Sequence, residues 1–144
     1  QFNLTTRRYS QEQVRMMCES PDWGTWWFRL KDKFGDHGLI GVILVNKKDE
    51  LWYIDSFLMS CRVLGRQMER FMLSEIIKAA QNENIKTLIG EYLPTAKNNL
   101  VENTYLNHGF NRGVDKGTFV YDLTTTNDYV CDFISSSESL TKLY

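Results

Sequence analysis

Positive charge gathers around one glycine near the middle of the chain, where Arg62, Gly65, Arg66 and Arg70 lie within nine residues. The spacing of apolar residues changes there from that of a strand to that of a helix, so a helix N-terminus is predicted at this turn. Such a terminus offers unpaired N–H groups and the positive end of the helix dipole, while glycine allows close approach of the backbone. The stretch therefore predicts a site for an anion such as a pyrophosphate, although solvated surface arginines would give the same pattern.

The elements that would position this turn follow from apolar spacing and turn residues. Ser10 and Gln13 form a capping-box pattern before the first helix, and Gly109 fits the residue that follows the last one. Gly90 predicts a close backbone approach at its strand. The predicted elements are a helix at 11–19, strands at 26–33, 39–45 and 51–59, a helix at 65–82, a strand at 87–92, a helix at 97–108 and a hairpin at 110–122. They make a mixed α/β (α+β) sheet with helices on its faces.

Composition limits the classes of function. The 144 residues carry 17 Lys and Arg against 18 Asp and Glu, a net charge of −1 that argues against a nucleic-acid partner. No apolar run reaches the roughly 18 residues of a membrane span, and no signal-peptide core opens the sequence, so we expect a cytoplasmic protein with no membrane partner. The three cysteines are widely spaced, and we expect no metal. One domain is predicted over 1–122, followed by a weakly ordered polar tail at 123–144.

Two motifs resemble those of the GNAT acyltransferases. The turn reads Arg62-Val63-Leu64-Gly65-Arg66-Gln67, similar to the cofactor motif R/Q-x-x-G-x-G/A except that Gln67 replaces a small residue. Asn98 stands seven residues before Tyr105, which is followed by Gly109-Phe110 in the same arrangement as the family's second motif. The resemblance covers about Thr6 to Asp122. It implies a mostly antiparallel central sheet flanked by helices on both faces, a splayed pantetheine cleft, and transfer of an acyl group from acetyl-CoA or another acyl-CoA.

The same resemblance implies which residues would bind the cofactor. Backbone groups of Phe57 and Met59 would pair with pantetheine, and Asn98 would contact its arm. The diphosphate would lie beside Arg62 on the N–H groups at the start of the long helix, at Leu64, Gly65, Arg66 and Gln67. Tyr105 would protonate the departing thiolate of coenzyme A; the alternative is a buried tyrosine whose hydroxyl bonds a backbone carbonyl.

Asp55 and Glu91 are the candidate general bases, because they lie on the two strands that would flank the cleft. Each also has a structural interpretation: Asp55 could hydrogen-bond a neighbouring side chain or strand, and Glu91 could pair with Arg62 or Lys97. A general base contributes about 10²- to 10⁴-fold, whereas holding two reactants together supplies effective molarities of about 10⁵ M or more. Acyl transfer would therefore survive a poorly placed base.

A narrower resemblance rests on three stretches: QFNLTTRRYS at the start, DSFLMSCRVLGR at 55–66 and GEYLPTAKNNLV at 90–101. They are similar to the carboxy-terminal, GNAT-like half of FkbH-like proteins. In those proteins a HAD-type domain precedes this one, and the pair is associated with loading a glyceryl unit onto an acyl carrier protein. The resemblance implies an upstream HAD-type partner and a second function, a non-catalytic module that binds the carrier's phosphopantetheine arm. A structural domain with an occluded cleft is a third.

Overall fold

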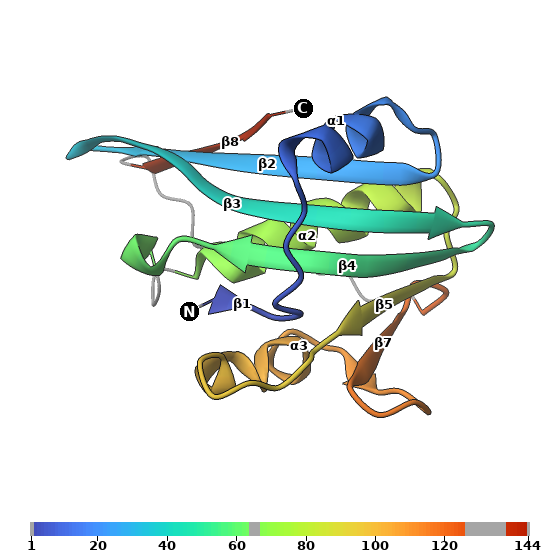
Figure 1. The fold of residues 1–144 in the computed structure, drawn as a ribbon. Coiled ribbons are helices and arrows are strands. Elements are labelled where there is room, and N and C mark those ends of the chain that lie inside the picture. The colour runs from blue at the N-terminus through green and yellow to red at the C-terminus, as the bar shows by residue number, and fades with distance from the viewer. Residues whose placement is uncertain (1, 64–66, 126–137, 144) are drawn as a thin grey trace.

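The computed structural model describes residues 2–63, 67–125 and 138–143, the last range by its backbone alone (Figure 1). Its eight-stranded sheet has the order β6-β7-β5-β4-β3-β2-β8, and β1 pairs with β4 beside this path. The helices are α1 Gln11–Glu19, α2 Met68–Asn82 and α3 Thr104–Asn107. The strands are β1 Phe2–Asn3, β2 Trp23–Asp32, β3 Gly35–Lys48, β4 Leu51–Met59, β5 Thr87–Glu91, β6 Asn111–Arg112, β7 Thr118–Asp122 and β8 Glu138–Leu143.

The sheet separates two layers. In Figure 1, α2 crosses behind β3 and β4, while α1 and the chain that leads into it cross in front. α2 has a continuous apolar stripe, the pattern of a helix with one face on a core. Its contact with the sheet is close, since a Cβ on Gly41 would lie 2.4 Å from the Cε atom of Met72. The largest fully buried side chains include Trp52, Phe28, Phe57, Leu4, Ile43, Ile54, Met68 and Met72.

The predicted fold class, a mixed and mostly antiparallel sheet with helices, is confirmed. Both α1 and β4 have the predicted bounds, and the capping box is present: the Gln13 N–H donates to Ser10 Oγ at 3.1 Å, and the Ser10 N–H to Gln13 Oε1 at 2.8 Å. Gly109 follows α3 with φ 91°, in the left-handed region that favours glycine. α2 begins at Met68, after Gln67 with φ 60°.

The predicted helix at 97–108 was wrong. A 3₁₀ turn at Asn99–Val101 and the four-residue helix α3 take its place. Asn98 explains the difference, because its side chain is 1% exposed and makes hydrogen bonds to backbone groups outside this segment. Hydrogen bonds from an asparagine side chain to backbone groups compete with a regular helix. Tertiary hydrogen bonds therefore override apolar spacing here.

Part of the segment expected as a polar tail belongs to the sheet. β8 pairs antiparallel with β2, from Trp27 opposite Leu143 to Asp32 opposite Glu138. Residues 126–137, among them the apolar Tyr129, Val130, Phe133 and Ile134, lie outside the described residues. Across the part of the chain that the structure describes, none of the helices combines the length and the apolar character that a bilayer span requires.

Candidate functional site

β4 and β5 pair over four residues of each strand and then part. Their parallel pairing begins at Leu51 opposite Thr87 and ends at Ile54 opposite Gly90. Asp55 lies at the end of this pairing in a β-bulge: Val45 of β3 faces Ile54 and Leu44 faces Ser56, which leaves Asp55 without an opposite residue. Because a bulge bends and twists its strand, the bulge accounts for the divergence of β4 from β5.

The N-terminal strap, which we define as residues 2–7, lies along the parted edge of β4 (Figure 1). β1 pairs antiparallel with the end of β4, and the Leu4 N–H donates to the Phe57 carbonyl at 3.2 Å. On the other side, the Leu4 carbonyl accepts from the Leu93 N–H at 2.8 Å, just after β5. Residues 2–5 are no more than 4% exposed. The strap therefore bridges β4 and the chain that follows β5.

The side-chain amide of Asn98 holds the strap to the loop after β5. Its Nδ2 donates to the carbonyls of Asn3 at 3.1 Å and Leu93 at 2.8 Å, while its Oδ1 accepts from the Thr95 N–H at 2.7 Å. The Tyr92 hydroxyl also donates to Oδ1, at 3.3 Å. A buried amide with all of these partners is fully satisfied, so Asn98 holds the strap and the loop after β5 in one arrangement.

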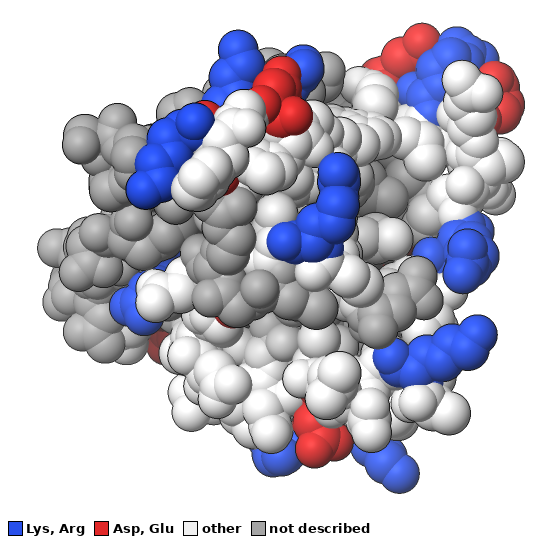
Figure 2. Space-filling model, turned by 90° about the vertical axis from the view of Figure 1, so that its left-hand side faces the viewer, with Lys and Arg blue, Asp and Glu red and all other residues white. Residues whose placement is uncertain are grey.

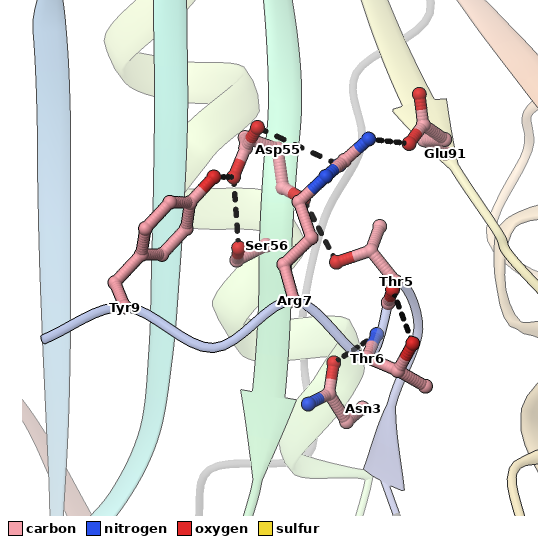
Figure 3. Close-up of polar contacts among 8 residues, drawn as sticks. All are labelled: Asn3, Thr5, Thr6, Arg7, Tyr9, Asp55, Ser56 and Glu91. Atoms are coloured by element: carbon pink, nitrogen blue, oxygen red, sulfur yellow. Dashed lines mark hydrogen bonds and ion pairs between the residues drawn. The ribbon is translucent and has the colours of Figure 1, made fainter.

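Two carboxylates meet at the parting, one from each strand (Figure 3). The Arg7 guanidinium lies between them: it forms a short ion pair with Glu91 Oε1, and its Nη1 lies 3.5 Å from Asp55 Oδ1 and 3.0 Å from the Asp55 carbonyl. The other oxygen of Asp55 accepts from Tyr9 Oη at 2.7 Å and Ser56 Oγ at 2.9 Å. Both candidate bases are therefore brought together, and one strap residue pairs with both.

Tyr9 stays protonated in this cluster over a wide pH range. Its pKa is raised to about 12, first by burial and then by its hydrogen bond to Asp55 and the charge of that carboxylate; Arg7 opposes the rise. Burial disfavours the phenolate, and so does a nearby negative charge. The Tyr9 hydroxyl therefore acts as a donor to Asp55 throughout the neutral range.

Tyr105 lies behind the parting, in the core. It is 1% exposed and packs against the rings of Phe57, Phe110 and Phe119. Its ring lies against Gly90, where a Cβ would come within 2.4 Å of it, so the close neighbour of this glycine is a side chain. Burial raises the pKa of Tyr105, against the opposing effect of the Glu91 backbone N–H. The Tyr105 hydroxyl has no hydrogen-bond partner among the described residues, so the expected carbonyl partner is absent there.

The predicted anion site is only partly described. Arg62 lies exposed in the 3₁₀ turn Cys61–Val63, and its Nη2 donates to the His37 carbonyl at 3.2 Å. Gln67 is exposed beside the start of α2. Leu64, Gly65 and Arg66 lie outside the described residues, so the diphosphate site stays a prediction.

The described residues at this end of the sheet form no single basic patch. In Figure 2, Lys and Arg side chains are spread over the face, with acidic side chains among them. Within the described ranges, no three His, Cys, Asp or Glu side chains come close enough together to hold a metal ion.

A groove of about 420 Å³ opens in front of the sheet, next to the carboxylate cluster. Its apolar lining comes from β2, β3 and β4, with Trp27, Val42, Leu44 and Leu58. Ser56, the hydrogen-bond partner of Asp55, also lines it, together with strap residues Asn3 and Arg7. A small molecule in the groove would lie against an apolar floor with the carboxylate cluster at its edge.

Sequence reasoning missed Arg7, Tyr9 and the whole strap as parts of the site. Phe2 and Leu4 alternate with polar residues, the period of a strand, but two positions are too few to predict one. Arg7 of the strap carried no spacing that pointed to Asp55 or Glu91. The backbone of Phe57 and Met59, expected to face pantetheine, pairs with the strap instead.

Comparison with known proteins addresses the fold. No protein-family model and no curated protein matches the sequence. Among solved structures, ribosomal-protein-S18-alanine N-acetyltransferase from Escherichia coli superposes with a TM-score of 0.62 at 11% identity, over 89% of this chain and 86% of that one. A putative acetyltransferase of the GNAT family from Desulfovibrio desulfuricans also gives 0.62 at 11% identity, over 78% of each chain. This chain has the GNAT fold.

A third GNAT-like structure was solved with ligands. N-acetylglutamate synthase from Neisseria gonorrhoeae, complexed with coenzyme A and N-acetyl-glutamate, has a TM-score of 0.61 at 14% identity, over 83% of this chain and 29% of that one. At these identities the GNAT likeness extends to the architecture alone. The narrower resemblance to FkbH-like proteins stays a prediction.

Proposed function

We propose that this chain is an acyltransferase domain that passes an acyl group from acetyl-CoA or another acyl-CoA to an acceptor amine. The observation that carries the proposal is the parting of β4 and β5 beyond Ile54 and Gly90, with Asp55 and Glu91 at that point, in a chain of GNAT fold. Two carboxylates at the point where two strands part are suited to take a proton from an incoming amine.

The groups around the parting match the chemistry of a pantetheine arm, but the strap occupies the edge of β4 that the arm would bind. The edge of β4 at Phe57, the Asn98 amide and the orphaned Tyr105 hydroxyl would serve an amide-bearing chain that ends in sulfur. Residues 2–5 now lie on that edge and are bonded on both sides. The arm therefore does not fit while the strap is in place, and its binding requires that residues 2–5 leave.

The acceptor would approach from the groove in front of the sheet. The groove reaches Ser56 and so lies beside Asp55, on the side of the sheet away from α2. Asp55 or Glu91 would hold the amine proton once Arg7 has moved. Tyr105 would be the proton donor on the other side, because its raised pKa keeps the hydroxyl protonated.

A second function is favoured by one observation, the ion pairing of Arg7 with both carboxylates. A domain whose candidate bases are neutralised would bind pantetheine without transferring an acyl group. The ligand would then be the phosphopantetheine arm of an acyl carrier protein, presented to an upstream HAD-type domain. The exposed Gln67, in place of a small residue at the predicted anion site, fits a single phosphodiester as well as a diphosphate.

Calorimetric titration separates the two proposals. Coenzyme A, acetyl-CoA, and a carrier protein in its holo and apo forms are titrated in turn, and release of free thiol from acetyl-CoA is followed with a panel of amines. Binding of coenzyme A with amine-dependent thiol release supports the acyltransferase. Binding of the holo carrier alone supports the carrier-arm module. If neither coenzyme A nor the holo carrier binds, both proposals are wrong and the structural interpretation is favoured.

A further inference from the structure

We propose that the N-terminal strap is a displaceable occupant of the pantetheine groove, so that strap and arm exclude each other and the domain is closed in the form described. This inference rests on the proposed function and adds its regulation. It concerns residues 2–7 and the edge of β4 that they cover.

The strap binds as an added strand would. Its pairs with β4 run from Phe2 opposite Met59 to Asn3 opposite Leu58, and Leu4 continues them by donating to Phe57. Strand addition gains its affinity from main-chain hydrogen bonds, which any extended chain with amide groups can make. Pantetheine carries two amides on a linear chain. The contacts that hold the strap are therefore contacts that an arm would use, and both cannot be made at once.

The same segment also covers the candidate bases. Residues 2–5 occupy the edge of β4, and two residues later Arg7 pairs with Asp55 and Glu91. The Thr5 hydroxyl adds a hydrogen bond of 3.0 Å to the Asp55 carbonyl. One displacement would thus open the groove and release both carboxylates. Cofactor entry and activation of the base are coupled because a single stretch of chain blocks both.

The backbone of the strap is strained at Thr6, where we expect the strap to detach. Thr6 has φ 57°, in the left-handed region, although its side chain is β-branched. β-branched residues are genuine outliers there, and such strain persists only where surrounding contacts enforce it. The Asn3 side chain supplies one such contact by accepting from the Thr6 N–H at 2.8 Å. Release of the strap would relieve this strain, which favours the open form.

A reversible lock tests the inference. Asn3 and Leu58 are opposite each other, next to the hydrogen-bonded pair of Leu4 and Phe57, and both line the groove. Alternate antiparallel pairs are not hydrogen-bonded and bring their Cα atoms to about 4.5 Å, a spacing that suits a disulfide. Asn3→Cys and Leu58→Cys are introduced in a background in which the native cysteines are replaced: Cys18→Ser, Cys61→Ser and Cys131→Ser.

Coenzyme A is the probe, and titrations compare the oxidised and reduced forms of this one protein. The inference expects the reduced form to bind and the oxidised form to bind at least about 100-fold more weakly, with binding restored by reductant, because a locked strap removes the competent state. The matched control locks Thr87→Cys to Asp122→Cys across β5 and β7, a pair beside the Leu123–Lys86 hydrogen bond and at the far end of β5. Its redox state should not change the affinity.

Equal affinity in the oxidised and reduced strap lock overturns the inference and leaves the proposed function standing. If the reduced form and the parent protein both fail to bind coenzyme A, the proposed function of acyl transfer from acyl-CoA is wrong. The inference then fails as well, because it requires coenzyme A to compete with the strap.

Amide hydrogen exchange without ligand gives an independent reading. The N–H groups of Leu4 and Leu93 hold the strap in place. If the strap opens by itself, they exchange at least about 100-fold faster than the slowest amides of β3 and β4, because local opening needs less free energy than global unfolding. Oxidation of the lock should slow the Leu4 amide to the rate of those core amides. Exchange of Leu4 only through global unfolding overturns the inference, whatever the titrations show.

Discussion

The side-chain amide of Asn98 donates a 3.1 Å hydrogen bond to the backbone carbonyl of Asn3, which lies 95 residues earlier in the chain. The bond joins the strap to the loop after β5 across the parting of the sheet. Asn98 was expected to contact pantetheine, and in this structure it contacts the strap, which we propose occupies the pantetheine groove. A side-chain amide that donates to a peptide carbonyl can donate in the same way to an amide carbonyl of pantetheine.

Replacing this amide should destabilise the domain. Asn98→Ala leaves the buried carbonyl of Asn3 and the N–H of Thr95 without their partner. An unsatisfied buried polar group costs about 1–3 kcal/mol, so we expect the free energy of unfolding to fall by roughly 2–4 kcal/mol. Denaturant titration measures the change. Asn99→Ala, at the exposed next residue, is the control and should shift it by less than about 0.5 kcal/mol. Equal effects at both positions would contradict the role of the buried amide.

Removing the Arg7 guanidinium should increase the affinity for coenzyme A. Arg7→Ala deletes the ion pairs to Asp55 and Glu91, whose side chains are partly exposed. Partly exposed ion pairs contribute about 0.2–1 kcal/mol, so coenzyme A should bind up to about fivefold more tightly when the strap loses this contact. Arg15→Ala removes two exposed ion pairs on α1 and is the matched control. Weaker binding in Arg7→Ala would mean that Arg7 belongs to the ligand site.

The Tyr9 hydroxyl predicts a pH dependence at the alkaline end. Its pKa is about 12 when folded, against an ordinary value of 10.0, so folded Tyr9 keeps a proton that the unfolded chain loses. Rising pH therefore lowers the free energy of unfolding, beginning near pH 10 and ending near pH 12. Denaturant titrations across this window should show a steeper fall for wild type than for Tyr9→Phe. The remaining tyrosines are common to both proteins, so equal slopes would contradict the assignment.

Tyr105→Phe separates catalysis from packing. The change removes only a hydroxyl that has no partner among the described residues, so the free energy of unfolding should stay the same or rise by up to about 1 kcal/mol. If Tyr105 donates the proton during transfer, kcat falls by about 10²-fold or more. Steady-state kinetics beside a denaturant titration of the same preparation measures both. An unchanged kcat would leave Tyr105 as a core residue only.

Local signals in the sequence predicted local structure. α1 has its predicted bounds because Ser10 and Gln13 cap one another over three residues. β4 has its predicted bounds because its aromatic and branched residues are bracketed by turns. β8 was missed because its polar residues carry no strand pattern, and its pairing with β2 depends on an edge formed more than 100 residues earlier. A distant partner leaves no trace in a short window of sequence.

Part of the candidate site could be predicted from the sequence and part could not. Motif spacing pointed to Asn98 and Tyr105, and strand order pointed to Asp55 and Glu91; the structure places all four around one parting. The strap could not be predicted in this way, since Arg7 contacts Asp55 and Glu91, which lie 48 and 84 residues later in the chain. Its contacts come from topology, which spacing within a motif does not encode.

The bulge at Asp55 has a consequence for how β4 changes neighbours. Before it, Trp52 and Ile54 point into the core; after it, Phe57 and Met59 do, so the apolar alternation skips one position. The extra residue shifts the alternation of side chains along β4 by one position. It lets β4 exchange β5 for the strap while keeping one side against the core throughout. A deletion of Asp55 would leave Trp52, Ile54, Phe57 and Met59 in unbroken alternation against the core, because their partners on β3 already alternate without a break. It would remove the bend at the point where β4 changes neighbours, so the exchange of partners depends on the inserted residue and side-chain orientation does not.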